Sequence, residues 1–161
     1  MTDMAATCLH VSCLPYHLLI DVCHILEICE IEADDVCRPS RRRTIWRDGS
    51  IEVIDLRSVL GSTTPPPPSA ALVCCSQDGN NPRMYLCDHV HSVVTLEDHE
   101  LLPLPHASGR IGEFADAVSP DPVNAALRYR MKGDFFDVLK DVTPSQTRVA
   151  AATKVAFKHN Q

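Results

Sequence analysis

Short apolar stretches, separated by residues that favour turns, run through most of this chain. Residues 8–13 and 16–20 are two such stretches, and Leu14-Pro15 lies between them. Short apolar runs on either side of a turn are typical of paired strands. The chain is therefore predicted to begin with a hairpin.

The pattern changes after this hairpin. Val22, Ile25, Leu26 and Ile28 are spaced as on one face of a helix. This spacing predicts a short amphipathic helix with acidic residues facing solvent after it. An arginine-rich polar loop is expected over residues 38–43.

A turn, a strand and a short helix are predicted to follow one another in the next segment. Residues 47–50 have turn chemistry, because Gly49 supplies a positive φ at little cost. The β-branched residues in 51–54 favour a strand. Residues 55–60 then fit one or two helical turns that end at Gly61.

The strand pattern returns beyond the prolines at residues 65–68, which predict a polyproline II connector. Residues 70–75 form a continuous apolar run, and the turn residues of 77–82 predict a hairpin to a second strand at 83–87. Residues 90–96 predict another strand or a bent continuation of the same one.

The last third of the chain is less regular. An irregular region containing residues 111–118 is expected between prolines, and residues 126–131 alternate as a strand. Residues 135–142 predict the beginning of a closing helix. Residues 143–161 carry basic residues and no acid, and they are expected to be a C-terminal tail, either solvated or a partner-binding helix.

Many short strands with few helical segments predict a mostly β architecture built on barrels. A chain of 161 residues has the usual size of one domain, which can contain two lobes. We expect this domain to span residues 7–142.

Composition narrows the classes of function. Apolar residues make up 45% of the chain and charged residues 22%, which is typical of a folded globular protein. The net charge is −6, and general nucleic-acid binding is disfavoured although residues 38–47 are rich in arginine. The sequence shows no export signal and no apolar run of about 20 residues. A soluble, cytoplasmic protein is expected.

The chain contains eight cysteines, which in a secreted protein would suggest disulfides. Most lie among leucine, valine and isoleucine, and no pair has the C-x-x-C spacing that presents two thiolates to one metal. We therefore expect reduced thiols that pack as small apolar groups, with a metal or redox role as the alternative. The cysteines are Cys8, Cys13, Cys23, Cys29, Cys37, Cys74, Cys75 and Cys87.

Common catalytic motifs are missing from the sequence, including phosphate-binding glycine loops, H-E-x-x-H and G-x-S-x-G. Cys87-Asp88-His89 is the most suggestive cluster, because an imidazole can activate a thiol. On a strand, however, Asp88 would point away from the other two side chains. We therefore expect no enzymatic activity, no cofactor and no metal.

The histidines are expected to be ordinary surface or partly buried residues. Among those considered as ligands, His89 and His91 form the only pair at a spacing that aims both rings in the same direction along a strand, and two ligands do not make a site. The histidines considered are His17, His24, His89, His91, His99 and His106.

Four segments of the chain resemble, in order, the landmarks of the CheW-like family. Residues 45–57 resemble, without a gap, the pattern N-L-R-G-x-[IV]-[IV]-P-[IV]-[IV]-D-L-R. Residues 19–28 look like the family's hairpin strand running into its V-x-E-[IV] segment. Residues 87–94, followed by 101–105, are similar to its V-D-x-V-x-x-V and I-x-P-x-P pair. Together they cover most of the predicted domain.

The resemblance implies a CheW-like fold of two intertwined five-stranded SH3-like β-barrel subdomains, with a few short helices. Members of the family are non-catalytic adaptors. They bridge the cytoplasmic tips of methyl-accepting chemoreceptors to the regulatory domain of a CheA-type histidine kinase. The same role in chemotaxis signal transduction, in the cytoplasm at membrane receptor arrays, is therefore implied for this chain.

The resemblance also implies a receptor-binding set made of Ile25, Glu27, Trp46, Arg47 and Asp48. Arg47 matches the arginine of the family's loop, and Ile25 and Glu27 match the V-x-E segment. An apolar groove would take a receptor helix, and the flanking charges would set its register. The alternatives are a solvated Glu27, an Arg47 paired with a nearby acid in the same molecule, and a Trp46 that belongs to the core.

Asp55, Leu56 and Arg57 match the D-L-R element, and Asp88 matches the aspartate of the V-D segment. We interpret these four residues as structural. Asp55 is expected to cap the helical turn that starts at Leu56.

The chain departs from the family pattern in the loop itself, where Ile45-Trp46-Arg47-Asp48 replaces N-L-R-G and Glu52 replaces a proline. A changed loop suggests a different receptor. Two alternatives to the coupling role therefore stay open. One is a divergent CheW-like paralogue that fills the same assembly without activating the kinase, or acts in a pilus or other signalling system. The other is a thiol-dependent enzyme or redox sensor that uses Cys87 or the Cys74-Cys75 pair.

Overall fold

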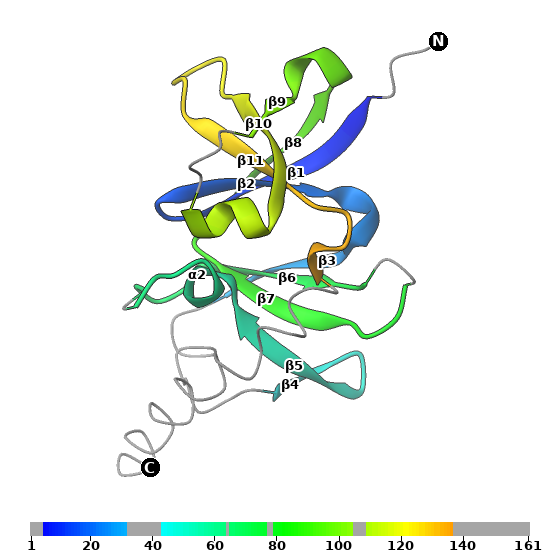
Figure 1. Ribbon diagram of the computed structural model, residues 1–161. Coiled ribbons are helices and arrows are strands. Elements are labelled where there is room, and N and C mark those ends of the chain that lie inside the picture. Colours follow the sequence, from blue (N-terminus) through cyan, green and yellow to red (C-terminus); the bar gives the residue numbers. More distant parts are fainter. Residues whose placement is uncertain (1–4, 32–42, 64, 77–78, 105–108, 137–161) are drawn as a thin grey trace.

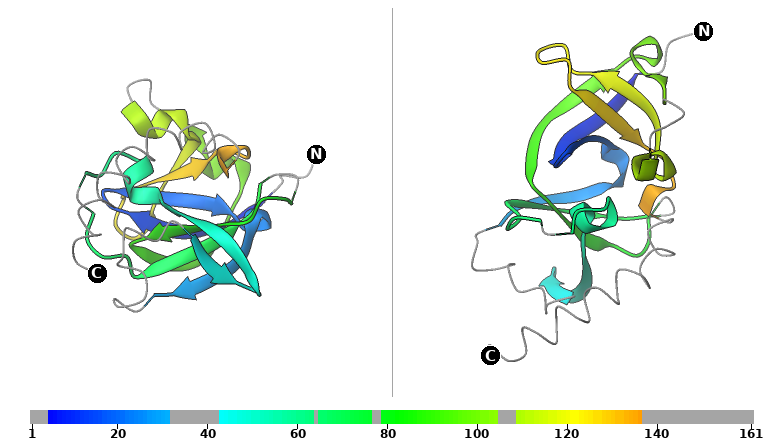
Figure 2. Two further views of the ribbon diagram at one scale, coloured as in Figure 1. Left: turned by 90° about the horizontal axis from the view of Figure 1, so that it is seen from below. Right: turned by 60° about the vertical axis from the view of Figure 1, so that its left-hand side comes forward.

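The computed structural model describes residues 5–31, 43–63, 65–76, 79–104 and 109–136. These residues form two β-sheets, one of six strands and one of five. Figure 1 shows the two sheets as an upper and a lower layer, and the right-hand view of Figure 2 shows the same separation.

The six-stranded sheet has the order β8-β1-β2-β11-β10-β9. Its neighbours are antiparallel, except that β2 and β11 run parallel. Its strands are β1 (Ala6–Cys13), β2 (Tyr16–Asp21), β8 (His89–Leu96), β9 (Leu102–Pro103), β10 (Ala115–Pro120) and β11 (Leu127–Met131).

The five-stranded sheet has the order β3-β6-β7-β5-β4, with one parallel pair, β5 and β7. The short helix α2 (Leu56–Val59) follows β5 directly. The strands are β3 (Ile25–Glu30), β4 (Arg43–Trp46), β5 (Gly49–Asp55), β6 (Ala70–Cys74) and β7 (Arg83–Cys87), and the short 3₁₀ helices are η1 (Val22–His24), η2 (Asp98–Glu100) and η3 (Gly109–Glu113).

The two sheets are intertwined along the chain. The N-terminal strands β1 and β2 pair with β8 and β11, whereas β3 to β7, which lie between them in sequence, build the other sheet. In Figure 1 the blue N-terminal strands accordingly lie beside the yellow and orange C-terminal ones. The predicted mostly β, intertwined fold is confirmed. One sheet has six strands rather than five because the two-residue strand β9 adds to its edge.

A shared core holds the two sheets together. In β1 and β2, alternate residues point toward the other sheet, as the pleat of a strand requires, and meet residues of β6 and β7. Burying each large apolar side chain contributes roughly 1.5–3 kcal/mol. The buried members from these strands are Leu9, Val11, Cys13, Leu18, Ile20, Ala70, Leu72, Cys74, Tyr85 and Cys87, and Phe114, Phe135 and Phe136 close the core after β9.

Several local predictions are confirmed. The hairpin around Leu14-Pro15, the hairpin from β6 to β7 and the strand β11 lie where the sequence pattern indicates them. Helix α2 ends as expected just before Gly61, whose φ is 104°. The region expected to be irregular contains η3 and β10.

Two local predictions are wrong. The amphipathic helix expected from Val22 to Ile28 is the single 3₁₀ turn η1 followed by the strand β3. Pairing with β6 decides this, because Ile28 lies opposite Leu72 in an antiparallel ladder that reaches from Ile25 to Glu30. The second error concerns the turn before β5: the positive φ angles belong to Arg47 and Asp48 rather than to Gly49.

Some predictions fall outside the described residues. They are most of the arginine-rich loop, the closing helix beyond Phe136 and the tail over residues 143–161. Within the part of the chain that the structure describes, no helix has the length and apolar character needed to cross a membrane.

Candidate partner-binding surface

The turn between β4 and β5 presents Arg47 at the edge of the five-stranded sheet. Trp46 and Gly49 are cross-strand partners, so Arg47 and Asp48 form a two-residue hairpin loop. Their φ angles are 49° and 64°, which places both in the left-handed region that a type I′ turn requires. Such turns match the twist of the strands, but left-handed φ is costly for residues with a Cβ.

Glu27 of β3 meets this hairpin. The indole Nε1 of Trp46 donates a hydrogen bond to Glu27 Oε2 at 3.1 Å, and Arg47 Nη2 lies 3.9 Å from Glu27 Oε1. The Arg47 guanidinium also lies 4.4 Å from the centre of the Trp46 ring, within the range of a cation–π contact. Because β3 and β4 are the two outer strands of the sheet, these contacts join its opposite edges and curl it toward a barrel.

The structure thus brings together three of the residues that the sequence singled out for receptor binding. Glu27, Trp46 and Arg47 are in mutual contact, and Asp48 lies next to Arg47 in the turn. Ile25 is not part of this group, because its half-buried side chain packs against the shared core. Trp46 is half-buried. It is therefore neither a fully exposed anchor nor a fully buried core residue.

The ion pair between Arg47 and Glu27 leaves both side chains accessible. Their exposed fractions are 62% and 43%. An exposed pair at this distance contributes little to stability, typically below about 1 kcal/mol. Both charges therefore remain available to a partner.

Exposed apolar side chains also occur on the same two edge strands, where Ile28 and Ile45 follow or precede Glu27 and Trp46 and so point to the other face of their strands. Leu26 and Ile28 of β3 are 42% and 49% exposed, and Ile45 of β4 is 79% exposed. We call this set the β3–β4 surface, and its members are Leu26, Glu27, Ile28, Ile45, Trp46, Arg47 and Asp48.

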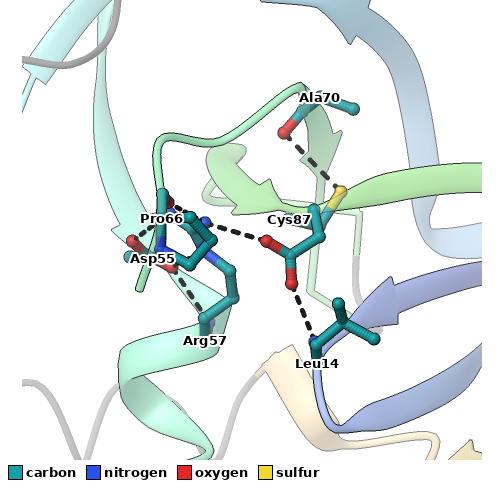
Figure 3. Close-up of polar contacts among 7 residues, drawn as sticks. Leu14, Asp55, Arg57, Pro66, Ala70 and Cys87 are labelled. Carbon is teal, nitrogen blue, oxygen red and sulfur yellow. Dashed lines mark hydrogen bonds and ion pairs between the residues drawn. The ribbon is translucent and has the colours of Figure 1, made fainter. Parts of the chain in front are cut away.

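A second group, around Arg57, lies at the junction of the two sheets (Figure 3). Arg57 is 2% exposed, and its guanidinium forms ion pairs at 2.9 Å with Asp55 Oδ2 and with Asp88 Oδ1. It also donates to the carbonyl of Pro66. Asp55 Oδ1 accepts from the backbone N–H of Arg57 at 2.9 Å, so that Asp55 occupies the capping position of α2 expected from the sequence.

Asp88 extends this group to the six-stranded sheet. Its Oδ2 accepts a hydrogen bond of 2.7 Å from the backbone N–H of Leu14, in the turn between β1 and β2. Burial alone would lower the pKa of Arg57, but its hydrogen bonds and charge interactions with Asp55 and Asp88 raise the pKa above the usual value. The guanidinium is therefore fixed as a cation that ties the connection after β5 to the first hairpin.

Four buried thiols are held in their protonated form. Burial is the main cause that raises the pKa of Cys8 to about 11 and of Cys87 to about 12, and it also raises the pKa of Cys13 and Cys74. Cys87 donates to the carbonyl of Ala70 within the sheet. A thiol must ionise to act as a nucleophile or metal ligand. These surroundings disfavour the thiol-dependent alternative at Cys87 and Cys74.

One group of side chains in the described part of the chain has the geometry to hold a metal ion. It consists of His10, His17 and His91, whose ring nitrogens lie within 4.8 Å of one another. The sequence reasoning missed His10, which lies in an apolar strand. The sequence pattern that could have indicated it is the alternation of side chains in β1, which places His10 on the face opposite Leu9 and Val11.

The comparison with solved structures assigns the fold. The chain superposes on the scaffolding protein TtCheW from Thermoanaerobacter tengcongensis with a TM-score of 0.60, over 80% of this chain and 90% of that one. The chain has a CheW-like fold. Sequence identity over the CheW-like match is 16%, and no protein-family model and no curated protein sequence matches the chain.

The CheW-like fold agrees with the order of landmarks in the sequence. The superposition covers a chain whose β2 and β11 pair in parallel, which no local pattern indicates, and whose two sheets are intertwined.

Proposed function

We propose that this protein is a non-catalytic adaptor that couples methyl-accepting chemoreceptors to a CheA-type histidine kinase in the cytoplasm. The observation that carries the proposal is the β3–β4 surface, in which Glu27, Trp46 and Arg47 meet on a CheW-like fold. The receptor-binding role that the sequence resemblance implies falls on this same surface.

The chemistry of the surface suits a helical partner. Leu26, Ile28 and Ile45 offer exposed apolar side chains on these two edge strands, and an amphipathic helix buries its apolar face against apolar side chains of its partner. Arg47 and Glu27 add one charge of each sign at the rim. Rim charges steer the approach of a partner and fix its register more than they add affinity.

The loop sequence bears on which receptor is bound. Trp46 contributes a large half-buried ring, held by its hydrogen bond to Glu27 and covered by Arg47. Tryptophan and arginine are enriched among the residues that dominate binding energy. Because Trp46 and Asp48 replace a leucine and a glycine of the family pattern, we expect selectivity for a receptor that complements this loop.

Co-sedimentation tests the proposal. Purified protein is mixed with membranes that contain the native chemoreceptor and with the CheA-type kinase, and the pellet is analysed. The expected result is that the wild type and Asp98→Lys, a charge reversal on the exposed helix η2, enter the pellet, whereas Arg47→Glu is reduced at least about tenfold. Equal sedimentation of Arg47→Glu and the wild type would show that Arg47 is not part of the binding site.

A charge exchange separates a role in binding from a role in folding. In the double variant Glu27→Arg with Arg47→Glu, the ion pair inside the molecule is kept with its direction reversed. If Arg47 contacts the receptor, binding stays lost in the double variant. Recovery of binding would show that Arg47 matters only through its contact with Glu27.

The altered loop supports one alternative of the same class. A paralogue that enters the assembly without activating the kinase would bind as described above but leave kinase activity unchanged. Measuring autophosphorylation of the kinase with receptor, with and without this protein, distinguishes the two. The coupling proposal expects a clear stimulation that Arg47→Glu abolishes.

A further inference from the structure

Three histidines from three neighbouring strands meet on one face of the six-stranded sheet. His10 belongs to β1, His17 to β2 and His91 to β8, and these strands are adjacent in the order β8-β1-β2. Ser12 pairs with His17 and His10 pairs with Leu19, so these side chains share a face. This face also carries the small apolar cluster of Cys8, Leu19 and Leu96.

The three rings pack against one another. His10 and His91 are stacked with centroids 4.4 Å apart, and the His10 and His17 centroids are 5.1 Å apart. His10 Nε2 lies 3.0 Å from His17 Nδ1, and His91 Nε2 lies 3.0 Å from Ser12 Oγ. One ring nitrogen of each histidine lies within 4.8 Å of those of the other two.

An irregularity in strand pairing creates the cluster. The register between β1 and β8 shifts between Leu9, which pairs with Val93, and Val11, which pairs with Val90. The shift leaves an additional residue on β8 in this interval and turns His91 toward His10. Such bulges re-aim side chains and are frequent near functional sites.

The protonation state of His10 and His91 at neutral pH favours the binding of a cation. Burial, followed by the charges of His91 and His17, lowers the pKa of His10 from 6.5 to about 4. Burial also lowers the pKa of His91. At neutral pH both imidazoles are therefore uncharged and retain a lone pair, which is the form that binds metals.

Two charged groups of opposite sign lie near His10. The Arg128 guanidinium of β11 lowers the pKa of His10, and the Asp121 carboxylate raises it. Arg128 is itself held by the carbonyls of Ser119 and Pro120 and by the Ser119 hydroxyl. These hydrogen bonds hold the guanidinium at β10.

We propose that His10, His17 and His91 form a binding site for a divalent transition-metal ion of the Zn²⁺ type. Imidazole nitrogen is a preferred ligand for such ions, and three protein ligands leave a fourth position for water or another small ligand. His10 is buried, His17 half-buried and His91 exposed. The ion would therefore enter from the His91 side.

Zinc binding requires small shifts of the three histidine rings. Tetrahedral zinc with bonds of about 2.0–2.1 Å sets its ligand atoms about 3.4 Å apart. His10 and His17 are already closer than this, so their rings separate slightly while His91 rotates away from Ser12. A bound ion would link β8, β1 and β2 and stabilise the folded state by mass action.

Titration with zinc chloride tests the site. The chain is purified without a histidine tag, freed of metal with EDTA and titrated in a calorimeter at pH 7.5. The expected result is one ion per chain with a dissociation constant in the low micromolar range or tighter. His17→Gln and His91→Gln are each expected to weaken binding by about tenfold or more, whereas His99→Gln, at an exposed histidine outside the cluster, leaves it unchanged.

Cobalt substitution identifies the ligands independently. Three imidazoles and water give tetrahedral Co²⁺ visible bands without the near-ultraviolet charge-transfer band of a thiolate. A thiolate band, or loss of binding in a Cys23→Ser Cys29→Ser variant, would assign the ion to the accessible cysteines and overturn the proposal. Wild-type protein that binds no zinc at about 100 μM would overturn it as well.

The variants keep the test independent of folding. His10→Gln is avoided as the main variant because His10 is buried. Circular dichroism must show that His17→Gln and His91→Gln are folded, and zinc is expected to raise the melting temperature of the wild type and of His99→Gln but not of the two cluster variants. Equal zinc-induced shifts in all four proteins would contradict the site.

Discussion

Arg57 carries a full charge inside the protein, and the environment that makes this possible is specific. Two carboxylates and a backbone carbonyl surround a guanidinium that is 2% exposed. A buried charge is tolerated when its donors are satisfied, and it becomes costly when one partner is removed. Arg57 therefore contributes less by attraction than by making every alternative arrangement of this junction unfavourable.

Replacing Arg57 by glutamine is expected to lower the free energy of unfolding by about 3–5 kcal/mol, because Asp88 stays buried without its cation. Urea unfolding followed by circular dichroism measures this. The matched control is Arg83→Gln, which removes the more exposed pair with Glu52 and is expected to cost about 1 kcal/mol or less. Equal losses in the two variants would show that the Arg57 group is not a structural tie.

The histidine cluster makes stability depend on pH in a defined window. Because the pKa of His10 falls from 6.5 to about 4 on folding, the unfolded chain binds more protons than the folded one between these values. Titration of His10 leaves the free energy of unfolding unchanged above pH 6.5 and lowers it as the pH falls from 6.5 to about 4. Below about pH 4 it causes no further loss.

Urea unfolding at pH 7, 6, 5 and 4 checks this expectation for metal-free protein. The wild type is expected to lose stability more steeply over this range than His10→Gln, since glutamine does not titrate. Asp121, exposed and with a lowered pKa of its own, titrates below this window. Parallel curves for the wild type and His10→Gln would contradict the inferred burial of a neutral imidazole.

At the scale of elements, the β4–β5 hairpin has a strained backbone at the two residues of its turn. Arg47 and Asp48 adopt left-handed φ angles that asparagine and glycine would accept more easily. The turn places the Arg47 guanidinium over Trp46, in reach of Glu27. Backbone strain of this kind is found more often at functional sites than elsewhere.

Relieving this strain is expected to stabilise the protein. Asp48→Gly should raise the free energy of unfolding by about 0.5 kcal/mol, since glycine adopts φ near 64° without a Cβ clash. The control is Thr44→Gly in β4, where an extended backbone favours the original residue and a loss of about 0.5–1 kcal/mol is expected. A destabilised Asp48→Gly would contradict this account of the turn.

At the scale of the whole molecule, the crossing of the chain between sheets makes two lobes into one folding unit. The six-stranded sheet is not a contiguous piece of sequence, because β1 and β2 belong with β8 to β11 and the whole five-stranded sheet lies between them in the chain. The shared core takes side chains from both sheets. Neither sheet can bury its inner face without the other, so we expect cooperative, two-state unfolding.

Two local probes check this cooperativity. Trp46, the single tryptophan, reports on the five-stranded sheet by fluorescence, and Cys8, fully buried on the other sheet, reports by pulsed alkylation and mass spectrometry. Their midpoints in urea are expected to coincide. Alkylation of Cys8 at clearly lower urea than the Trp46 transition would show that the six-stranded sheet opens by itself.

Local patterns were sufficient for much of the fold and for part of the candidate site. The first hairpin, the β6–β7 hairpin and the cap at Asp55 follow from interactions between residues close in sequence. Glu27, Trp46 and Arg47 were singled out by resemblance, and the structure places them in contact. Their role in binding a receptor stays a prediction. Ile25 was named with them, but its side chain packs toward the shared core instead.

What the sequence alone determined about this protein is therefore short-range: strand alternation, turns, helix caps and the mostly β class, because these depend on backbone preferences of neighbouring residues. Tertiary structure decided the rest. Pairing with β6 made a strand of the segment from Ile25 to Glu30, against its helical spacing. A shifted register between β1 and β8 brought His91 to His10. These outcomes depend on hydrogen bonds and burial between strands far apart in the chain, which no local pattern encodes.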